Sequence, residues 1–104
     1  QREQKTLWRS VIGTKQRPGV TFLGNAIGAY TNVVSSAYNV GRFRSKVENA
    51  LDELGLDLTE MEDTYPITQS FENDGLPDEI ARMIQTVREI DSVAFGTFYV
   101  HNEP

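Results

Sequence analysis

Two segments of the chain carry apolar residues at helical spacing, and this pattern constrains the fold more than any other feature of the sequence. Gly55 follows the first segment at the position where a left-handed helix cap is expected. Pro77 precedes the second, and Asp78 and Glu79 come next, as suits a helix N-terminus. The sequence therefore predicts two amphipathic helices, each with one face to bury. The first stripe is Phe43, Val47, Ala50, Leu51 and Leu54, and the second is Ile80, Met83, Ile84, Val87 and Ile90.

The segments before the first predicted helix have strand-like composition. Residues 6–14 alternate and are rich in β-branched and aromatic side chains. Pro18 and Gly19 supply turn chemistry, and residues 20–23 could return as the second arm of a hairpin. Residues 30–37, with two valines at their centre, are a further predicted strand.

Strand-like segments also lie between and after the helices. Residues 57–63 and 65–71 are predicted as one long strand or two short ones, bent near Pro66. Residues 93–101 alternate again and close the chain.

These elements predict an α+β domain, with two helices packed on one face of a largely antiparallel sheet. With a break near Pro66, the part from residue 30 onward has the order βαββαβ of a ferredoxin-like motif. We therefore expect a single domain over residues 1–104, in which residues 29–101 form the core and residues 1–24 add an N-terminal strand or hairpin.

Composition narrows the class of protein. The chain has 104 residues, 38% of them hydrophobic and 24% charged, which fits one folded domain. It has no cysteine, which excludes disulfides, thiolate metal sites and a cysteine nucleophile. No apolar run approaches the roughly 20 residues that span a bilayer, so we expect a soluble protein with no membrane partner, and a cytoplasmic location by default.

Charge is distributed unevenly along the chain. Residues 1–46 contain eight Lys and Arg and one acid, a net charge of +7, whereas residues 47–104 carry a net charge of −12. Two explanations stay open: the halves neutralise each other across the fold, or an acidic surface meets a basic partner. The candidate partner-binding residues are Asp57, Glu60, Glu62 and Asp63.

The start of the first predicted helix is cationic, with Arg42, Arg44 and Lys46 in its first turns. This order opposes the helix dipole, and free backbone N–H groups beside three cations could hold a phosphate or a carboxylate. The alternative is that these cations are solvated and pair with the acidic half of the chain.

Catalytic motifs are absent from the sequence. His101 is the only histidine, and it is the first residue to test if the protein is an enzyme. No spacing indicates a metal or another cofactor, and a pI near 4.8 argues against nucleic acid as a partner. We therefore expect a non-enzymatic protein-binding domain, an inhibitor or immunity-type protein that binds a basic protein. A homodimer that binds an anion or a small molecule is the alternative, and a small enzyme that uses His101 comes third.

Overall fold

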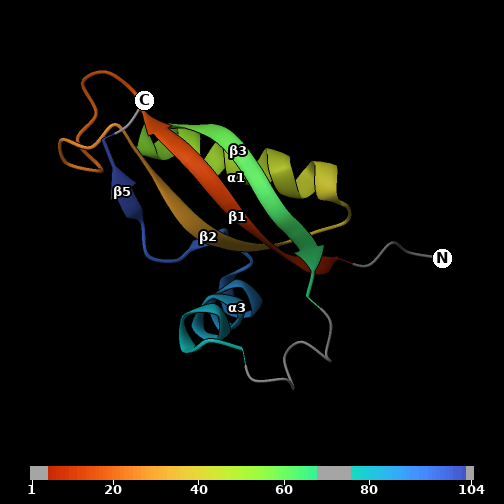
Figure 1. The fold of residues 1–104 in the computed structure, drawn as a ribbon. Helices are drawn as coiled ribbons and strands as arrows, with labels where there is room; N and C mark the ends of the chain where they lie inside the picture. Colours follow the sequence, from red (N-terminus) through yellow and green to blue (C-terminus); the bar gives the residue numbers. More distant parts are fainter. Residues whose placement is uncertain (1–4, 68–75, 103–104) are drawn as a thin grey trace.

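The structure is a computed structural model that describes residues 5–67 and 76–102 of the chain. Over these residues, two helices accompany a five-stranded antiparallel sheet (Figure 1). The predicted α+β class is therefore confirmed. Neither helix in the described ranges is long and apolar enough to cross a membrane. The elements are β1 (Thr6–Gln16), β2 (Gly28–Ala37), α1 (Val40–Leu54), β3 (Leu56–Pro66), α3 (Asp78–Ile90), β4 (Ala94–Phe95) and β5 (Tyr99–His101).

Strand β1 lies inside the sheet, between β3 and β2, and not in an N-terminal appendage. The hairpin arm predicted for residues 20–23 is wrong, because β1 pairs directly with β2 from Thr6 opposite Ala37 to Lys15 opposite Gly28. Residues 17–27 connect the two strands through tight turns instead of a strand. In this loop, Leu23 is buried in the core that α1 covers, which favours a compact loop over an extended arm.

The two helices cover opposite faces of the sheet (Figure 1). Successive strand residues point to opposite faces: Val33 of β2 packs in the core with α1, and its neighbour Val34 packs with α3. The expectation that both helices share one face is thus wrong. The reason is that β2 has a buried valine on each of its faces, so both faces need a helix to cover them.

Local signals position both helices. The side chain of Asn39 accepts a hydrogen bond from the Arg42 backbone N–H, and Gly55 ends α1 in the left-handed region, with φ of 78°. Helix α3 begins at Asp78 after Pro77, as predicted. Both helices therefore begin and end close to the residues that the sequence indicated.

Strand β3 is one continuous strand with two register shifts against β1. The second strand predicted for residues 65–71 falls largely outside the described residues. The sheet order β3-β1-β2-β4 does not confirm the ferredoxin-like order, because β1, from outside that motif, lies between β3 and β2. The predicted strand over residues 93–101 is divided into β4 and β5, which both pair with β2.

Candidate functional site

Helix α3 covers only part of its face of the sheet. It packs on β2 and β4, where Val34 and Ala94 join its buried side chains. The remainder of this face carries polar and aromatic residues that are mostly half-buried or exposed; Tyr30 is 44% and Tyr99 is 63% exposed. We call this surface the open face. From the pairing of the strands, its residues are Asp57, Glu60, Glu62 and Tyr65 on β3, Arg9, Val11, Gly13 and Lys15 on β1, Gly28, Tyr30 and Asn32 on β2, and Tyr99 and His101 on β5.

Two buried glycines of the open face lie beneath side chains of neighbouring strands. Gly13 lies opposite both Tyr30 and Glu60, and Gly28 lies opposite His101. A Cβ atom at Gly13 would lie 2.7 Å from Cγ of Glu60, and one at Gly28 would lie 3.1 Å from Nε2 of His101. Both side chains therefore extend over a glycine of a neighbouring strand. They border a cavity of about 460 Å³, the glycine pocket, lined by Thr14, Lys15, Ile27, Tyr30, Thr59, Glu60 and His101.

Glu60 and Glu62 form a pair of like charges on β3, which we call the acidic pair. They lie on the same face of the strand, opposite Gly13 and Val11. The negative charge of Glu60 raises the pKa of Glu62 above its usual value, and a hydrogen bond between the two side chains adds to this effect. The described structure contains no ion pair at either carboxylate. The pair therefore holds two negative charges without an ion-pair partner among the described residues.

The other two predicted acids of β3 have different environments. Asp57 accepts a hydrogen bond from Arg17 at 2.9 Å, and Arg17 also contacts Asp52 at 2.7 Å. Its two carboxylate partners raise the pKa of Arg17, so they balance its charge. Asp63 lies at one of the register shifts and has a positive φ of 51°. Of the four predicted residues, the structure brings Glu60 and Glu62 together, and it pairs Asp57 internally.

The predicted anion-binding residues do not converge on one point. Arg44 pairs with Glu48 at 3.5 Å, whereas Arg42 lies over the ring of Tyr38, 5.6 Å from its centroid. Lys46 donates a hydrogen bond to the backbone carbonyl of Ser36 at 2.8 Å. Arg42 and Lys46 line one cavity of about 490 Å³, and Arg44 is not among its lining residues.

A carboxylate of the chain itself lies beside these cations. Asp91 is 3.0 Å from Nζ of Lys5 and 3.7 Å from Nζ of Lys46. A hydrogen bond from Ser36 and the two lysines lower the pKa of Asp91 to about 2, against a smaller opposing effect of burial. In this region the basic and acidic halves of the chain neutralise each other, as the first of the two charge explanations expected.

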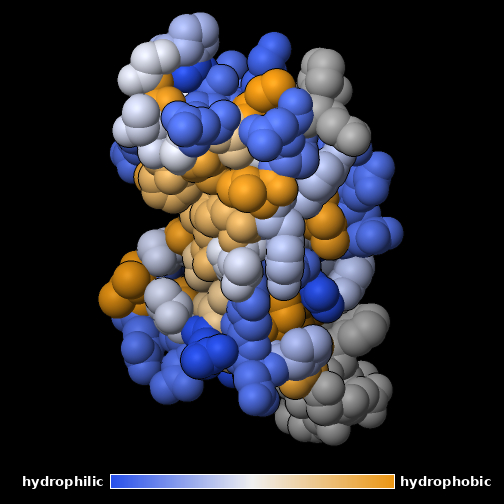
Figure 2. Space-filling model, turned by 60° about the vertical axis from the view of Figure 1, so that its left-hand side comes forward, coloured by the Kyte–Doolittle hydropathy of each residue, from blue (hydrophilic) through white to orange (hydrophobic). Residues whose placement is uncertain are grey.

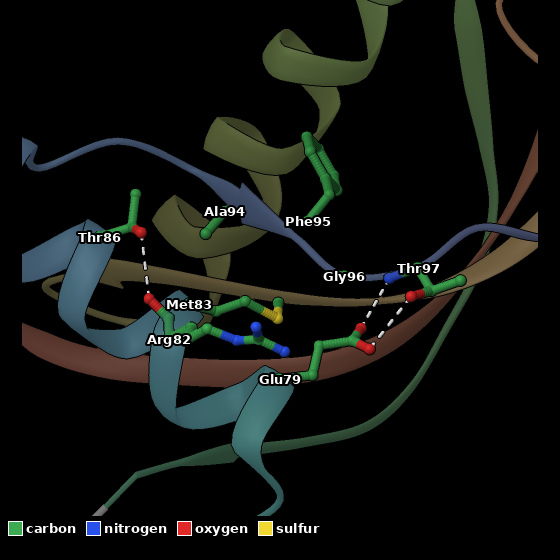
Figure 3. A pocket seen from close by; sticks show the side chains of 8 residues that line it. All are labelled: Glu79, Arg82, Met83, Thr86, Ala94, Phe95, Gly96 and Thr97. Carbon is green, nitrogen blue, oxygen red and sulfur yellow. Dashed lines mark hydrogen bonds between the residues drawn. The ribbon is translucent and has the colours of Figure 1, made fainter.

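Sequence reasoning missed a contact that attaches α3 to the last strands. The carboxylate of Glu79 accepts hydrogen bonds from the Thr97 backbone N–H at 2.6 Å and from its hydroxyl at 3.1 Å (Figure 3). These residues line a cavity of about 530 Å³ together with Arg82 and Thr86. Glu79 thereby binds a backbone donor where the strand is interrupted between β4 and β5, which gives it a structural role.

The two edges of the sheet differ in chemistry. Edge strand β3 carries the acidic pair and two register shifts, both of which discourage pairing with another strand. On the side that carries β5, hydrophobic surface lies in a hollow between hydrophilic regions (Figure 2). Phe22 is 48% exposed and packs edge-on against Phe98, which in turn contacts Phe95.

His101 belongs to the glycine pocket, where its ring centroid lies 5.3 Å from that of Tyr30. The structure thus brings the single histidine close to one of the predicted partner-binding acids, Glu60. Among the described residues, no three His, Asp or Glu side chains could together hold a metal ion. Gly13, Gly28 and Tyr30 were not predicted as site residues, because only strand pairing places them beside Glu60 and His101.

Comparisons with protein-family models, with curated proteins and with solved structures found no match to this chain. The function is therefore inferred from the chemistry of the open face.

Proposed function

We propose that this protein is a non-enzymatic protein-binding domain that engages a basic protein through the acidic pair on β3, in the manner of an inhibitor or immunity-type protein. The observation that carries the proposal is the unbalanced charge of Glu60 and Glu62, which raises the pKa of Glu62. Two carboxylates held together repel each other, and a cation from a partner would replace that repulsion with attraction.

The ion pairs that other carboxylates of the fold make support this choice of surface. Asp52 and Asp57 share Arg17, and Asp91 contacts Lys5 and Lys46. Those carboxylates are already balanced by cations from the N-terminal half of the chain. The acidic pair has no such balance in the described structure, so its charge is available to attract a basic protein at long range.

The experiment is affinity capture at low salt from the native source, with elution by a salt gradient. Three baits are compared: the wild-type chain, the Glu60→Gln/Glu62→Gln variant, and the control Glu53→Gln/Glu89→Gln, which removes the same charge from the two helices. We expect one basic protein, near one-to-one, on the wild type and the control. The Glu60→Gln/Glu62→Gln variant should lose it or release it at much lower salt.

Retention of that basic protein by the Glu60→Gln/Glu62→Gln variant, at the same salt as the wild type, would contradict the proposed surface. Loss from both variants alike would show that net charge, and not the acidic pair, drives the interaction.

A further inference from the structure

The glycine pocket adjoins the acidic pair, and Glu60 belongs to both. Neighbouring strands are about 4.8 Å apart, so the side chain of Glu60 on β3 reaches over Gly13 on β1, one strand further in. Glu60 also lines the pocket, so a ligand bound there would meet its side chain. The pocket and the acidic pair form one continuous surface.

The walls of the pocket have different chemistry. Gly13 and Gly28 are buried beneath Glu60 and His101 and do not line the pocket, and the lack of a Cβ atom at each lets these two side chains lie close to the sheet. Tyr30 and His101 form an aromatic wall, with their rings 37° from coplanar. Ile27 adds apolar surface at 37% exposure, and Glu60 supplies the negative charge. A carboxylate beside aromatic rings is an environment for an organic cation.

The size and lining of the pocket suit a guanidinium group. Its volume of about 460 Å³ lies in the lower part of the range of about 300–1,000 Å³ that small-molecule sites occupy. A guanidinium group on its aliphatic stem is smaller than most such ligands. It stacks on aromatic faces, pairs with a carboxylate through two parallel N–H donors, and is more weakly hydrated than an ammonium group.

Lys15 also lines the pocket, and its positive charge opposes a cationic ligand. Its side chain is exposed, and its cross-strand neighbour on the same face is Asp57. Glu62, next to the pocket on β3, adds a second negative charge. Asp57 already pairs with Arg17. Arg9, on the same face, is bound to Tyr65 and Asn32. Beside the pocket, the two carboxylates of the acidic pair therefore face the single charge of Lys15.

From this geometry we propose that the glycine pocket is the specificity site for the basic partner and that it takes the side chain of an arginine. The inference rests on the proposed function and names the group that the partner inserts. In the complex, the guanidinium pairs with Glu60 and stacks against Tyr30 and His101.

The test uses Nα-acetyl-arginine amide as the probe and Nα-acetyl-citrulline amide as its neutral control, in a titration followed by the backbone amide resonances of the ¹⁵N-labelled protein. The arginine probe should shift the amides of Gly13, Gly28 and Glu60 saturably, and the citrulline probe should not. Glu60→Gln should weaken probe binding about tenfold or more, because a charge-assisted bidentate pair is lost. Tyr30→Leu should weaken it by a smaller factor, about threefold to tenfold, through loss of stacking.

The outcomes separate this inference from the proposed function. Arginine-induced shifts that spread over all acidic surfaces, or that persist unchanged in Glu60→Gln, would overturn the pocket as an arginine site. If the basic protein still depends on the acidic pair in the capture experiment, the proposed function stands without it. Saturable shifts at the pocket, with no basic protein captured, would support a guanidinium site and count against a protein partner. The same spectra report folding of each variant.

Discussion

The two faces of the sheet are covered to different extents, although the helices that cover them are similar in length, 15 residues for α1 and 13 for α3. On the α1 face, Phe43, Val47 and Leu51 are completely buried against β1, β2 and β3. On the other face, α3 packs only toward β2 and β4 and leaves the open face to solvent. The covered face stabilises the fold, and the uncovered half leaves its side chains in contact with solvent.

The open face needs no cover to be compatible with folding. Its strands satisfy their backbone hydrogen bonds within the sheet, and its side chains are largely polar or aromatic with polar groups. Antiparallel sheets commonly have one solvated face. What is unusual here is the like-charge pair beside a pocket, because the repulsion between Glu60 and Glu62 does not stabilise the domain.

The largest expected effect on stability comes from truncation of a side chain in the core of the covered face, set against an exposed ring in the loop between β1 and β2. Phe43→Ala should lower the free energy of unfolding by about 3–5 kcal/mol, because it leaves a cavity in the α1 core. The matched variant Phe22→Ala should cost about 1 kcal/mol or less, since that ring is 48% exposed. Urea unfolding of both variants measures the contrast. Similar losses for the two would show that α1 does not cover the main core.

A second contrast lies between the two buried glycines of the open face. A Cβ atom at Gly28 would meet the backbone carbonyl of Thr14, whereas one at Gly13 would meet side-chain atoms of Glu60 and Thr59. Because backbone cannot move aside without parting the strands, Gly28→Ala should destabilise the protein by about 1–3 kcal/mol.

For Gly13→Ala we expect a loss below about 1 kcal/mol, since the ends of flexible side chains can move. Urea unfolding measures both variants. Equal losses would mean that Glu60 is held as rigidly as the backbone.

The elements that could be predicted from the sequence are those with local signals. The stripe that includes Phe43 and Leu51 predicts α1, and Gly55 marks its end because only a residue that tolerates positive φ suits the cap. Pairing between distant strands has no such signal. The position of β1 between β3 and β2, and the assignment of Val33 and Val34 to different helices, therefore emerged only in the structure.

The candidate site was predictable to the extent that it depends on strand alternation. Glu60 and Glu62 are two residues apart, so a regular strand places them on one face. Asp57 would point to the other face in a regular strand, but a register shift between Gly13 and Thr14 inserts one residue and returns it to the face of Glu60. Nothing in the sequence marks that bulge.

The smallest expected effect on stability is a gain instead of a loss, and it comes from substitution of Glu62. Glu60 raises the pKa of Glu62 above its usual value of 4.5, so the folded chain binds the proton more tightly than the unfolded chain does. The protonated carboxyl stabilises the fold below pH 4.5, and this contribution is lost as the pH rises through the folded pKa. Glu62→Gln should therefore make the domain slightly more stable at pH 7, and its advantage should vanish as the pH falls below 4.5.

Thermal unfolding of wild type and Glu62→Gln between pH 3 and pH 8 measures this difference, with Glu53→Gln, which removes one exposed carboxylate from α1, as the control for the loss of a charge. A gain in stability on loss of a charge would mean that the domain keeps Glu62 at a cost to its own fold, as expected of a residue that serves a partner. If Glu62→Gln were instead less stable at pH 7, the acidic pair would be a stabilising part of the sheet, and the observation that carries the proposed function would be lost.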